Sequence, residues 1–119
     1  MKYDIKKQLR SFVYAFRGLR ACVGKEQNLG FHLIAALVVV GAGCWLGLTR
    51  MEWIAVVLSI GLVVAAELFN TAIEGLTDMV SPGFDPRAGR VKDIAAAAVL
   101  VCAMAAAVVG LIVFVPKLF

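Results

Sequence analysis

The residues best suited to chemistry form one polar row in the second half of the chain. Glu67, Asn70, Thr71, Glu74 and Asp78 recur at intervals that include three, four and seven residues. At 3.6 residues per turn, these intervals place the side chains on one face of a helix. The surrounding residues are mostly apolar. The row is therefore a polar stripe on an apolar helix, and carboxylates in such a stripe can act as general bases or bind a metal ion.

The depth of Glu67 makes it the most unusual member of this row. If an apolar span begins near Trp53, Glu67 lies 14 residues further on, about 21 Å along a helix that rises 1.5 Å per residue. The hydrocarbon core of a bilayer is about 30 Å thick, so Glu67 falls inside it and Glu74 falls near its edge. An acid inside the core costs at least about 2.5–3.5 kcal/mol and usually has a function. The plainer alternative is a packing pair between Glu67 and a basic residue of the N-terminal segment.

Two more acids precede apolar segments and should lie at the same membrane face. Glu26 comes just before the first apolar span, and the pair Lys92 and Asp93 comes just before the third. Carboxylates are ligands that Mg²⁺ prefers, usually together with substrate phosphates. A deeper carboxylate suits a general base for a hydroxyl held in lipid. These residues favour phosphoryl transfer to a lipid alcohol, although a proton-coupled carrier would also use buried acids.

Composition defines the elements that must position these groups. The chain has 119 residues, of which 62% are hydrophobic and 17% charged, with a net charge of +4. Soluble domains have about 45–50% apolar and 25% charged residues, and a small domain needs more polar surface than a large one. A water-soluble monomer is therefore excluded. The predicted class is an all-α integral membrane protein with a single domain.

The apolar pattern predicts an amphipathic surface helix over 1–25, with apolar residues on one side and basic residues on the other. Three spans follow at 29–48, 53–79 and 94–115, the second extending to the cytoplasmic side. Residues 80–93 are predicted to be a cytoplasmic loop, because Pro82, Gly83 and Pro86 interrupt the helical pattern.

The distribution of basic residues predicts the orientation. The positive-inside rule places Lys- and Arg-rich segments in the cytoplasm. The N-terminal segment and the second loop carry most of them: Lys2, Lys6, Lys7, Arg10, Arg17, Arg20, Lys25, Arg87, Arg90 and Lys92. We therefore expect a cytoplasmic N-terminus in a membrane protein. Cys22, Cys44 and Cys102 have no zinc spacing, no soluble-type nucleotide motif is present, and no nucleic-acid partner is expected.

Several segments carry a more specific signal. They are Tyr-Ala-Phe-Arg-Gly-Leu-Arg at 14–20, Glu26, Ala-Glu-Leu-Phe-Asn-Thr-Ala-Ile-Glu at 66–74, Asp78, and Lys-Asp-Ile-Ala-Ala-Ala-Ala-Val-Leu at 92–100. Together they resemble the bacterial membrane-integrated lipid kinases, the diacylglycerol kinase and undecaprenol kinase family. The likeness covers nearly the whole chain, including its length and its three-span layout.

The resemblance implies a homotrimer with active sites between neighbouring subunits, ATP as phosphoryl donor, and Mg²⁺. Glu67 would be the catalytic base that takes the proton from the lipid hydroxyl, and Asn70 would orient Glu67 or the phosphoryl group. Glu26 and Glu74 would hold Mg²⁺ or contact it beside the ATP phosphates. The residues implied on the nucleotide side are Tyr14, Gly83, Phe84, Asp85, Lys92 and Asp93. Asp85 departs from the family pattern, since many members have His there.

The lipid substrate is left open between two alcohols. Asn-Thr-Ala-Ile-Glu and the Pro86-Arg87-Ala88 linker look slightly closer to members assigned to undecaprenol than to those assigned to diacylglycerol. Two hypotheses of another class remain beside the kinase: a small proton-coupled transporter subunit that uses the same acids as a relay, and a non-catalytic scaffold anchored by helix 1–25. A relay does not need Glu26 and the pair at 92–93, and a scaffold does not need Glu67 at depth.

Overall fold

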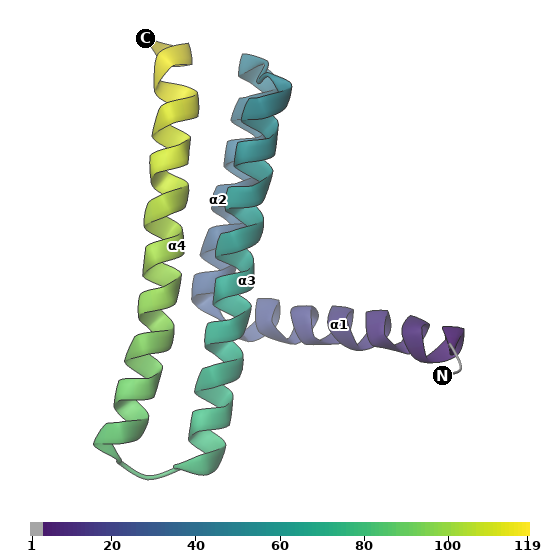
Figure 1. Ribbon diagram of the computed structural model, residues 1–119, viewed down its shortest axis with the longest axis vertical. Helices are drawn as coiled ribbons and strands as arrows, with labels where there is room; N and C mark the ends of the chain where they lie inside the picture. The colour runs from purple at the N-terminus through teal and green to yellow at the C-terminus, as the bar shows by residue number, and fades with distance from the viewer. Residues whose placement is uncertain (1–3) are drawn as a thin grey trace.

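In the computed structural model, which describes residues 4–119, four helices follow one another along the chain. They are α1 (Ile5–Lys25), α2 (Gln27–Leu46), α3 (Arg50–Val80) and α4 (Pro86–Leu118). The last three run side by side as a bundle, and α1 extends sideways away from this bundle (Figure 1). Each helix of the bundle is long and apolar enough to cross a membrane. The all-α prediction with three spans is therefore confirmed.

The two ends of the bundle differ in their connections. We call the end with the α3–α4 connection, residues 81–85, the turn end. We call the end with the α2–α3 connection, residues 47–49, the far end; the C-terminus lies there too (Figure 1). At 1.5 Å per residue α3 and α4 are each about 45–50 Å long, which exceeds the ~30 Å hydrocarbon core. Both helices are therefore longer than the hydrocarbon core is thick.

Local sequence explains where the helices begin and end. Thr49 and Glu52 form a reciprocal capping box at the start of α3, where each side chain accepts from the other residue's backbone N–H. Gly47 ends α2 with a φ of 72°, a left-handed conformation that glycine adopts without steric cost. Asp85 caps α4 by accepting from the backbone N–H of Arg87 at 2.9 Å.

The prediction that residues 80–93 form a loop is wrong for most of that range, because α4 already begins at Pro86. Proline is favoured in the first turn of a helix, since its fixed φ suits the helix and its missing N–H needs no partner there. The basic residues of the predicted loop therefore lie on the first turns of α4. The other bounds differ by a few residues: α3 begins at Arg50 rather than at residue 53, and α4 ends at Leu118. Residues 1–3 of the predicted surface helix lie outside the described residues.

A buried apolar cluster of the bundle lies near its far end. Leu48, Val56 and Val113 form a buried apolar cluster, with Trp53 and Phe114 against it. An ion pair between Lys117 Nζ and Glu52 Oε1, 3.0 Å apart, joins α4 to α3 at the same end. Most other large apolar side chains are exposed, as expected for helices that face lipid or partner helices rather than a core of their own.

Gly43 allows α2 to approach α3 at this end. A Cβ atom at position 43 would lie 2.8 Å from Trp53 Cη2 and 2.9 Å from Leu48 Cδ1. We expect Gly43→Leu to lower the stability of the folded protein by about 1–3 kcal/mol, the usual cost of overpacking. Gly41→Leu is the matched control, because nothing lies within 4 Å of a Cβ at position 41. Thermal unfolding in detergent measures both, and equal melting temperatures would contradict the packing role of Gly43.

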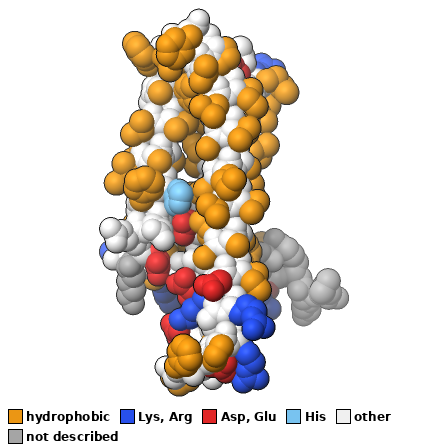
Figure 2. Space-filling view, turned by 90° about the vertical axis from the view of Figure 1, so that its left-hand side faces the viewer, with side chains coloured by type: hydrophobic (Ala, Val, Ile, Leu, Met, Phe, Trp, Pro, Cys, Tyr) orange, Lys and Arg blue, Asp and Glu red, His pale blue; other side chains and the backbone are white. Residues whose placement is uncertain are grey.

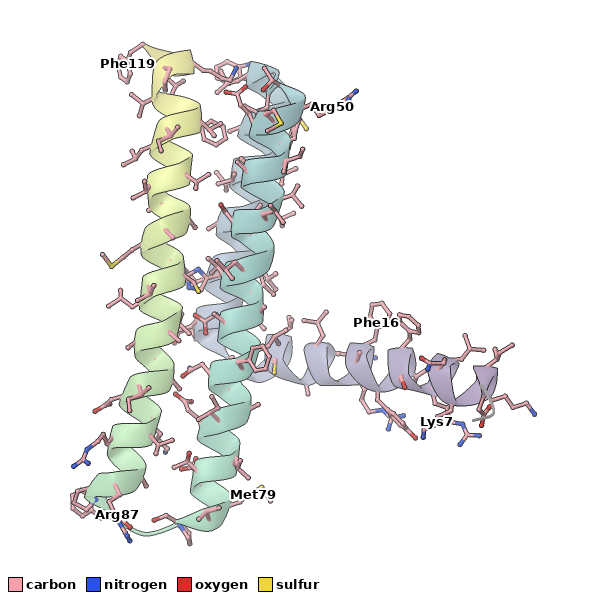
Figure 3. The ribbon with its side chains drawn as sticks, viewed as in Figure 1. Lys7, Phe16, Arg50, Met79, Arg87 and Phe119 are labelled. Carbon is pink, nitrogen blue, oxygen red and sulfur yellow. The ribbon has the colours of Figure 1, made fainter. Side chains whose placement is uncertain are left out.

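The orientation of α1 gives its two sides different surroundings. Phe16 projects toward the far-end side and Lys7 toward the turn-end side (Figure 3). The outward-facing apolar residues of this helix include Leu9, Phe12 and Phe16, all more than half exposed. The bundle leaves these residues uncovered.

Candidate active site

Glu67 is buried between α2 and α3 at one end of the polar row. It retains only 3% of its surface, and its carboxylate Oε1 lies 3.0 Å from Nε2 of His32. His32 belongs to the second turn of α2, whereas Glu67 belongs to α3. The alternative prediction, a packing pair between Glu67 and a basic residue of the N-terminal segment, is wrong. The partner of Glu67 is His32 of α2.

Asn70 and Glu74 continue the row from Glu67 toward the turn end. The Asn70 amide Nδ2 donates to Glu74 Oε1 at 3.4 Å, one turn further along α3. Asn70 itself is buried, and its Oδ1 atom has no hydrogen-bond partner among the described residues. A buried carbonyl oxygen without a partner is unusual in proteins. Oδ1 is thus free to accept a hydrogen bond from a ligand or from a neighbouring subunit.

Lys92 and Asp78 close the row at the turn end. The ammonium group of Lys92 on α4 pairs with Asp78 on α3. The two side chains are partly exposed. On the face shown in Figure 2, most acidic and basic side chains gather in the lower half, and the upper half is largely apolar. The row therefore runs from an apolar environment at Glu67 to a polar one at Lys92.

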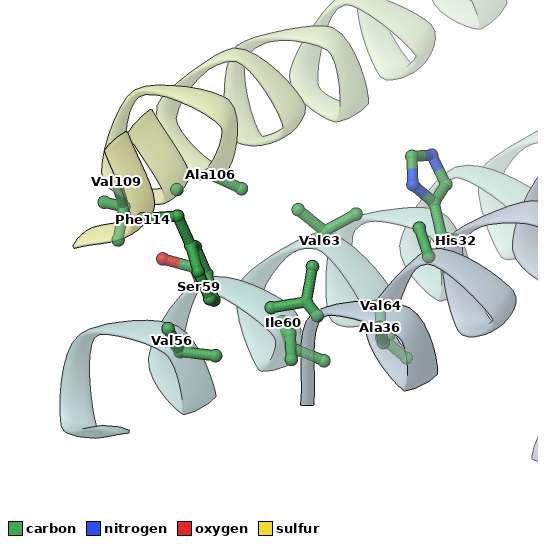
Figure 4. Close-up of a pocket in the computed structure, with 13 residues that line it drawn as sticks. His32, Ala36, Val56, Ser59, Ile60, Val63, Val64, Ala106, Val109 and Phe114 are labelled. Atoms are coloured by element: carbon green, nitrogen blue, oxygen red, sulfur yellow. The ribbon is translucent and has the colours of Figure 1, made fainter. Parts of the chain in front are cut away.

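An apolar cavity of about 130 Å³ extends from His32 toward the far end. Its walls come from all three bundle helices, and most of its surface is apolar (Figure 4). Ser59 is the other polar side chain among its walls, and its hydroxyl donates to the Ala55 carbonyl oxygen at 2.8 Å. The cavity thus offers an apolar chain a place to lie with one end at the His32–Glu67 pair.

The remaining predicted site residues lie apart from the hydrogen bonds and ion pairs that connect the polar row in the described part of the chain. Among the described residues, the side chains of Tyr14, Glu26 and Asp93 make no hydrogen bond or ion pair with it. Tyr14 lies on α1 with Arg17 Cζ 5.6 Å from its ring centre. Glu26 occupies the junction between α1 and α2 and is half-buried.

The α3–α4 connection holds three further predicted residues. Phe84 is 98% exposed, and the Gly83 carbonyl oxygen accepts from Ser81 Oγ at 3.4 Å. The Arg87 guanidinium pairs with Asp85 at 3.0 Å, and this contact, together with the Arg87 N–H, lowers the pKa of Asp85 below its usual value. Asp85 is therefore a helix cap that stays ionised at neutral pH.

The carboxylates do not form a metal site by themselves. Within residues 4–119, no group of three or more His, Cys, Asp or Glu side chains is arranged to hold a metal ion. Mg²⁺ is commonly bound by one or two carboxylates, with substrate phosphates and water completing its six ligands. Glu74, with a half-buried carboxylate beside Asn70, fits that kind of shared site.

Comparison with known proteins identifies the family. The family model for prokaryotic diacylglycerol kinase matches residues 13–114, which reach from α1 almost to the end of α4. The chain belongs to this family. Membership in the prokaryotic diacylglycerol kinase family places it among the membrane lipid kinases.

Several members of this family are similar over most of their length. The undecaprenol kinase of Bacillus subtilis (strain 168) is 38% identical over 97% of this chain and 94% of its own. The diacylglycerol kinase of Escherichia coli (strain K12) is 32% identical over 80% of this chain and 78% of its own. The diacylglycerol kinase of Synechocystis is 34% identical over 92% of this chain and 63% of its own. Both substrate names therefore occur among its relatives.

His32 is the residue of the site that sequence reasoning did not select. It is the most polar side chain of the predicted span 29–48. The available signal was its depth, because an ionisable residue inside a spanning segment is a functional candidate by default. What was missing was its partner, which lies 35 positions away in the sequence.

Proposed function

We propose that the protein transfers the γ-phosphoryl group of ATP to the hydroxyl group of a membrane lipid, with Glu67 as general base. The observation that carries this proposal is the polar row itself. A carboxylate buried between helices lies at one end of this row, and a partly exposed ion pair between α3 and α4 lies at the other. A lipid hydroxyl can reach the first end from the bilayer, and a nucleotide can reach the second from water.

The proposed reaction is an in-line displacement at the γ-phosphorus. Glu67 accepts the proton as the O–H bond of the lipid alcohol breaks, and the alcohol oxygen forms the new bond to phosphorus. The bond from phosphorus to the bridging oxygen breaks, and ADP leaves with that oxygen. Such transfers depend mainly on positioning and charge stabilisation. We assign Asn70, between Glu67 and Glu74, to orienting the reacting groups through its Oδ1 atom, which has no hydrogen-bond partner among the described residues.

The nucleotide side of the proposed site lies at the turn end. Lys92 would offset phosphate charge, and Glu26 and Glu74 would hold Mg²⁺ beside the phosphates. When bound, Mg²⁺ would neutralise charge on the phosphoryl oxygens. The other residues we assign to the nucleotide are Tyr14, Gly83, Phe84, Asp85 and Asp93. Lys92 pairs with Asp78 in the structure. To contact the ATP phosphates, Lys92 would have to leave Asp78 or contact both groups at once.

The proposed arrangement in the bacterial inner membrane places the turn end in the cytoplasm. Basic residues are frequent on α1 and on the first turns of α4, as the positive-inside rule requires of cytoplasmic segments. We propose that α1 is amphipathic and lies in the interface, with Phe16 toward the lipid and Lys7 toward the head groups and water (Figure 3). A homotrimer would cover part of the exposed apolar surface of the bundle and complete each site with a neighbouring subunit.

We favour undecaprenol slightly over diacylglycerol as the substrate. The similarity to the Bacillus subtilis undecaprenol kinase extends over nearly all of both chains. The apolar cavity beside His32 could take part of a long prenyl chain. Both lipids present one hydroxyl group near the membrane surface, so the reaction chemistry is the same.

A direct assay tests the proposal. Purified protein in detergent is given Mg²⁺ and labelled ATP, with undecaprenol and diacylglycerol offered in separate reactions. We expect label in at least one lipid phosphate, with the higher kcat/KM for undecaprenol. Removal of divalent metal with EDTA should abolish transfer, and added Mg²⁺ should restore it. If neither lipid is labelled by folded protein, the kinase proposal is wrong, and proton-coupled transport becomes the function to test.

A further inference from the structure

His32 is an ionisable side chain in a span that otherwise carries no formal charge. Its imidazole is about one-quarter exposed, and its Nε2 atom lies 3.0 Å from the buried carboxylate of Glu67. We propose that His32 is a positioning residue for Glu67: its Nε2–H donates to Oε1 and thereby leaves Oε2 directed toward the lipid hydroxyl. This inference rests on the proposed role of Glu67 as general base.

The register of two antiparallel helices brings these residues to the same depth. His32 lies 14 residues before the end of α2, and Glu67 lies 17 residues after the start of α3. These separations correspond to about 21 Å and 26 Å from the far end. Both residues therefore sit in the same part of the ~30 Å hydrocarbon core, and the pair spans the α2–α3 contact.

The other polar neighbours of Glu67 have their donors engaged elsewhere. The Thr71 hydroxyl donates to the backbone carbonyl of Glu67 at 3.0 Å rather than to its carboxylate. The Asn70 amide donates to Glu74. Among the described residues, His32 is thus the donor within reach of the Glu67 carboxylate. A buried carboxylate is costly unless it is paired or hydrogen-bonded, so the imidazole supplies a contact that this site requires.

The surroundings of His32 restrict the position of its ring. Phe31 packs edge-on against it, with ring centres 5.8 Å apart and an interplanar angle of 79°. The imidazole also lines the end of the apolar cavity (Figure 4). An alcohol that enters with its chain in this cavity meets His32 and Glu67 together. Donation from Nε2 to one carboxylate oxygen then selects the other oxygen as proton acceptor.

A set of substitutions at position 32 tests the inference. His32→Leu removes the donor and keeps an apolar side chain of similar bulk. His32→Gln places an amide N–H close to the position of Nε2. We expect His32→Leu to lower kcat by about 10- to 100-fold, the usual effect of losing an orienting partner, with the KM for Mg-ATP changed less than twofold. We expect His32→Gln to recover most of the lost kcat.

Two further variants separate positioning from structure. Ile34→Leu is the matched control on an exposed residue of the same helix that does not line the cavity, and it should keep the kcat of the unmodified protein. The double variant His32→Leu/Glu67→Gln should be no slower than Glu67→Gln, because effects of residues that act as a unit are not additive. All rates are taken per folded protein, quantified by size-exclusion chromatography in detergent.

The outcomes distinguish this inference from the proposed function. If the unmodified protein phosphorylates lipid and His32→Leu retains its kcat, the positioning role is wrong and the kinase stands. The same holds if His32→Leu lowers only the yield of folded protein, or if His32→Gln is as slow as His32→Leu. If the unmodified protein phosphorylates neither lipid, the proposed function fails first.

Discussion

Replacement of Glu67 by Gln is expected to reduce lipid phosphorylation by about 10²- to 10⁴-fold, the contribution of a general base. Glutamine has the shape of glutamate and can still accept from His32 through its carbonyl oxygen, so the α2–α3 contact is kept. It cannot take the proton of the lipid alcohol. Membrane insertion and folding should therefore be unchanged, while kcat falls. Steady-state rates with Mg-ATP and the better of the two lipids measure the effect.

Glu52→Gln is the matched control for this substitution. It makes the same chemical change on the same helix, but at the far end of the bundle. Glutamine can preserve the capping box with Thr49, although it weakens the pair with Lys117. We expect its kcat to equal that of the unmodified protein. A Glu67→Gln variant that folds and stays near the unmodified rate would exclude Glu67 as the base.

Replacement of Glu74 by Gln is expected to have the second-largest effect. Its carboxylate is half-buried at the point where the row reaches the polar turn end, one helical turn from Asn70. Glutamine can still present its carbonyl oxygen to the Asn70 amide, so the substitution removes charge with little change of contact. If Glu74 binds Mg²⁺ beside the phosphates, kcat/KM for Mg-ATP should fall by about 10²- to 10³-fold, the range for one lost charge-stabilising group.

The dependence on Mg²⁺ concentration makes this prediction specific. We expect Glu74→Gln to need a higher Mg²⁺ concentration for half-maximal rate, and excess Mg²⁺ to restore part of the activity. The concentration of lipid needed for half-maximal rate should change little, because Glu74 lies on the water-exposed side of Glu67. A variant with an unchanged Mg²⁺ requirement would show that Glu74 does not bind the metal.

The sequence by itself determined the class and the polar row. Hydrophobic content and apolar run length predicted three spans, because a helix in lipid must be apolar over about 20 residues. The helical period placed Glu67, Asn70 and Glu74 on one face, and the structure places all three on α3 with the Asn70–Glu74 contact between neighbouring turns. These features depend on residues close together in the chain, which is why sequence reasoning reaches them.

The bounds of the helices could be predicted from the sequence, except where a capping residue changed the effect of a proline. Pro86 was read as a helix breaker, but it follows a capping aspartate and so begins α4 instead. The same residue type interrupts a helix in its interior and is favoured in its first turn. The position of the cap decides between the two, and the predicted loop over 80–93 was therefore too long.

Only the tertiary structure decided which groups from different helices meet. The pairing of His32 with Glu67 and of Lys92 with Asp78 depends on how α2, α3 and α4 are aligned along one another. That alignment is set by contacts such as the close approach at Gly43, where a single side-chain atom would collide with Trp53. Periodicity gives the face on which a residue lies, but not the height at which a neighbouring helix presents its own residues. The sequence thus determined that Glu67 is a buried acid, and the packing of the helices decided that its partner is His32.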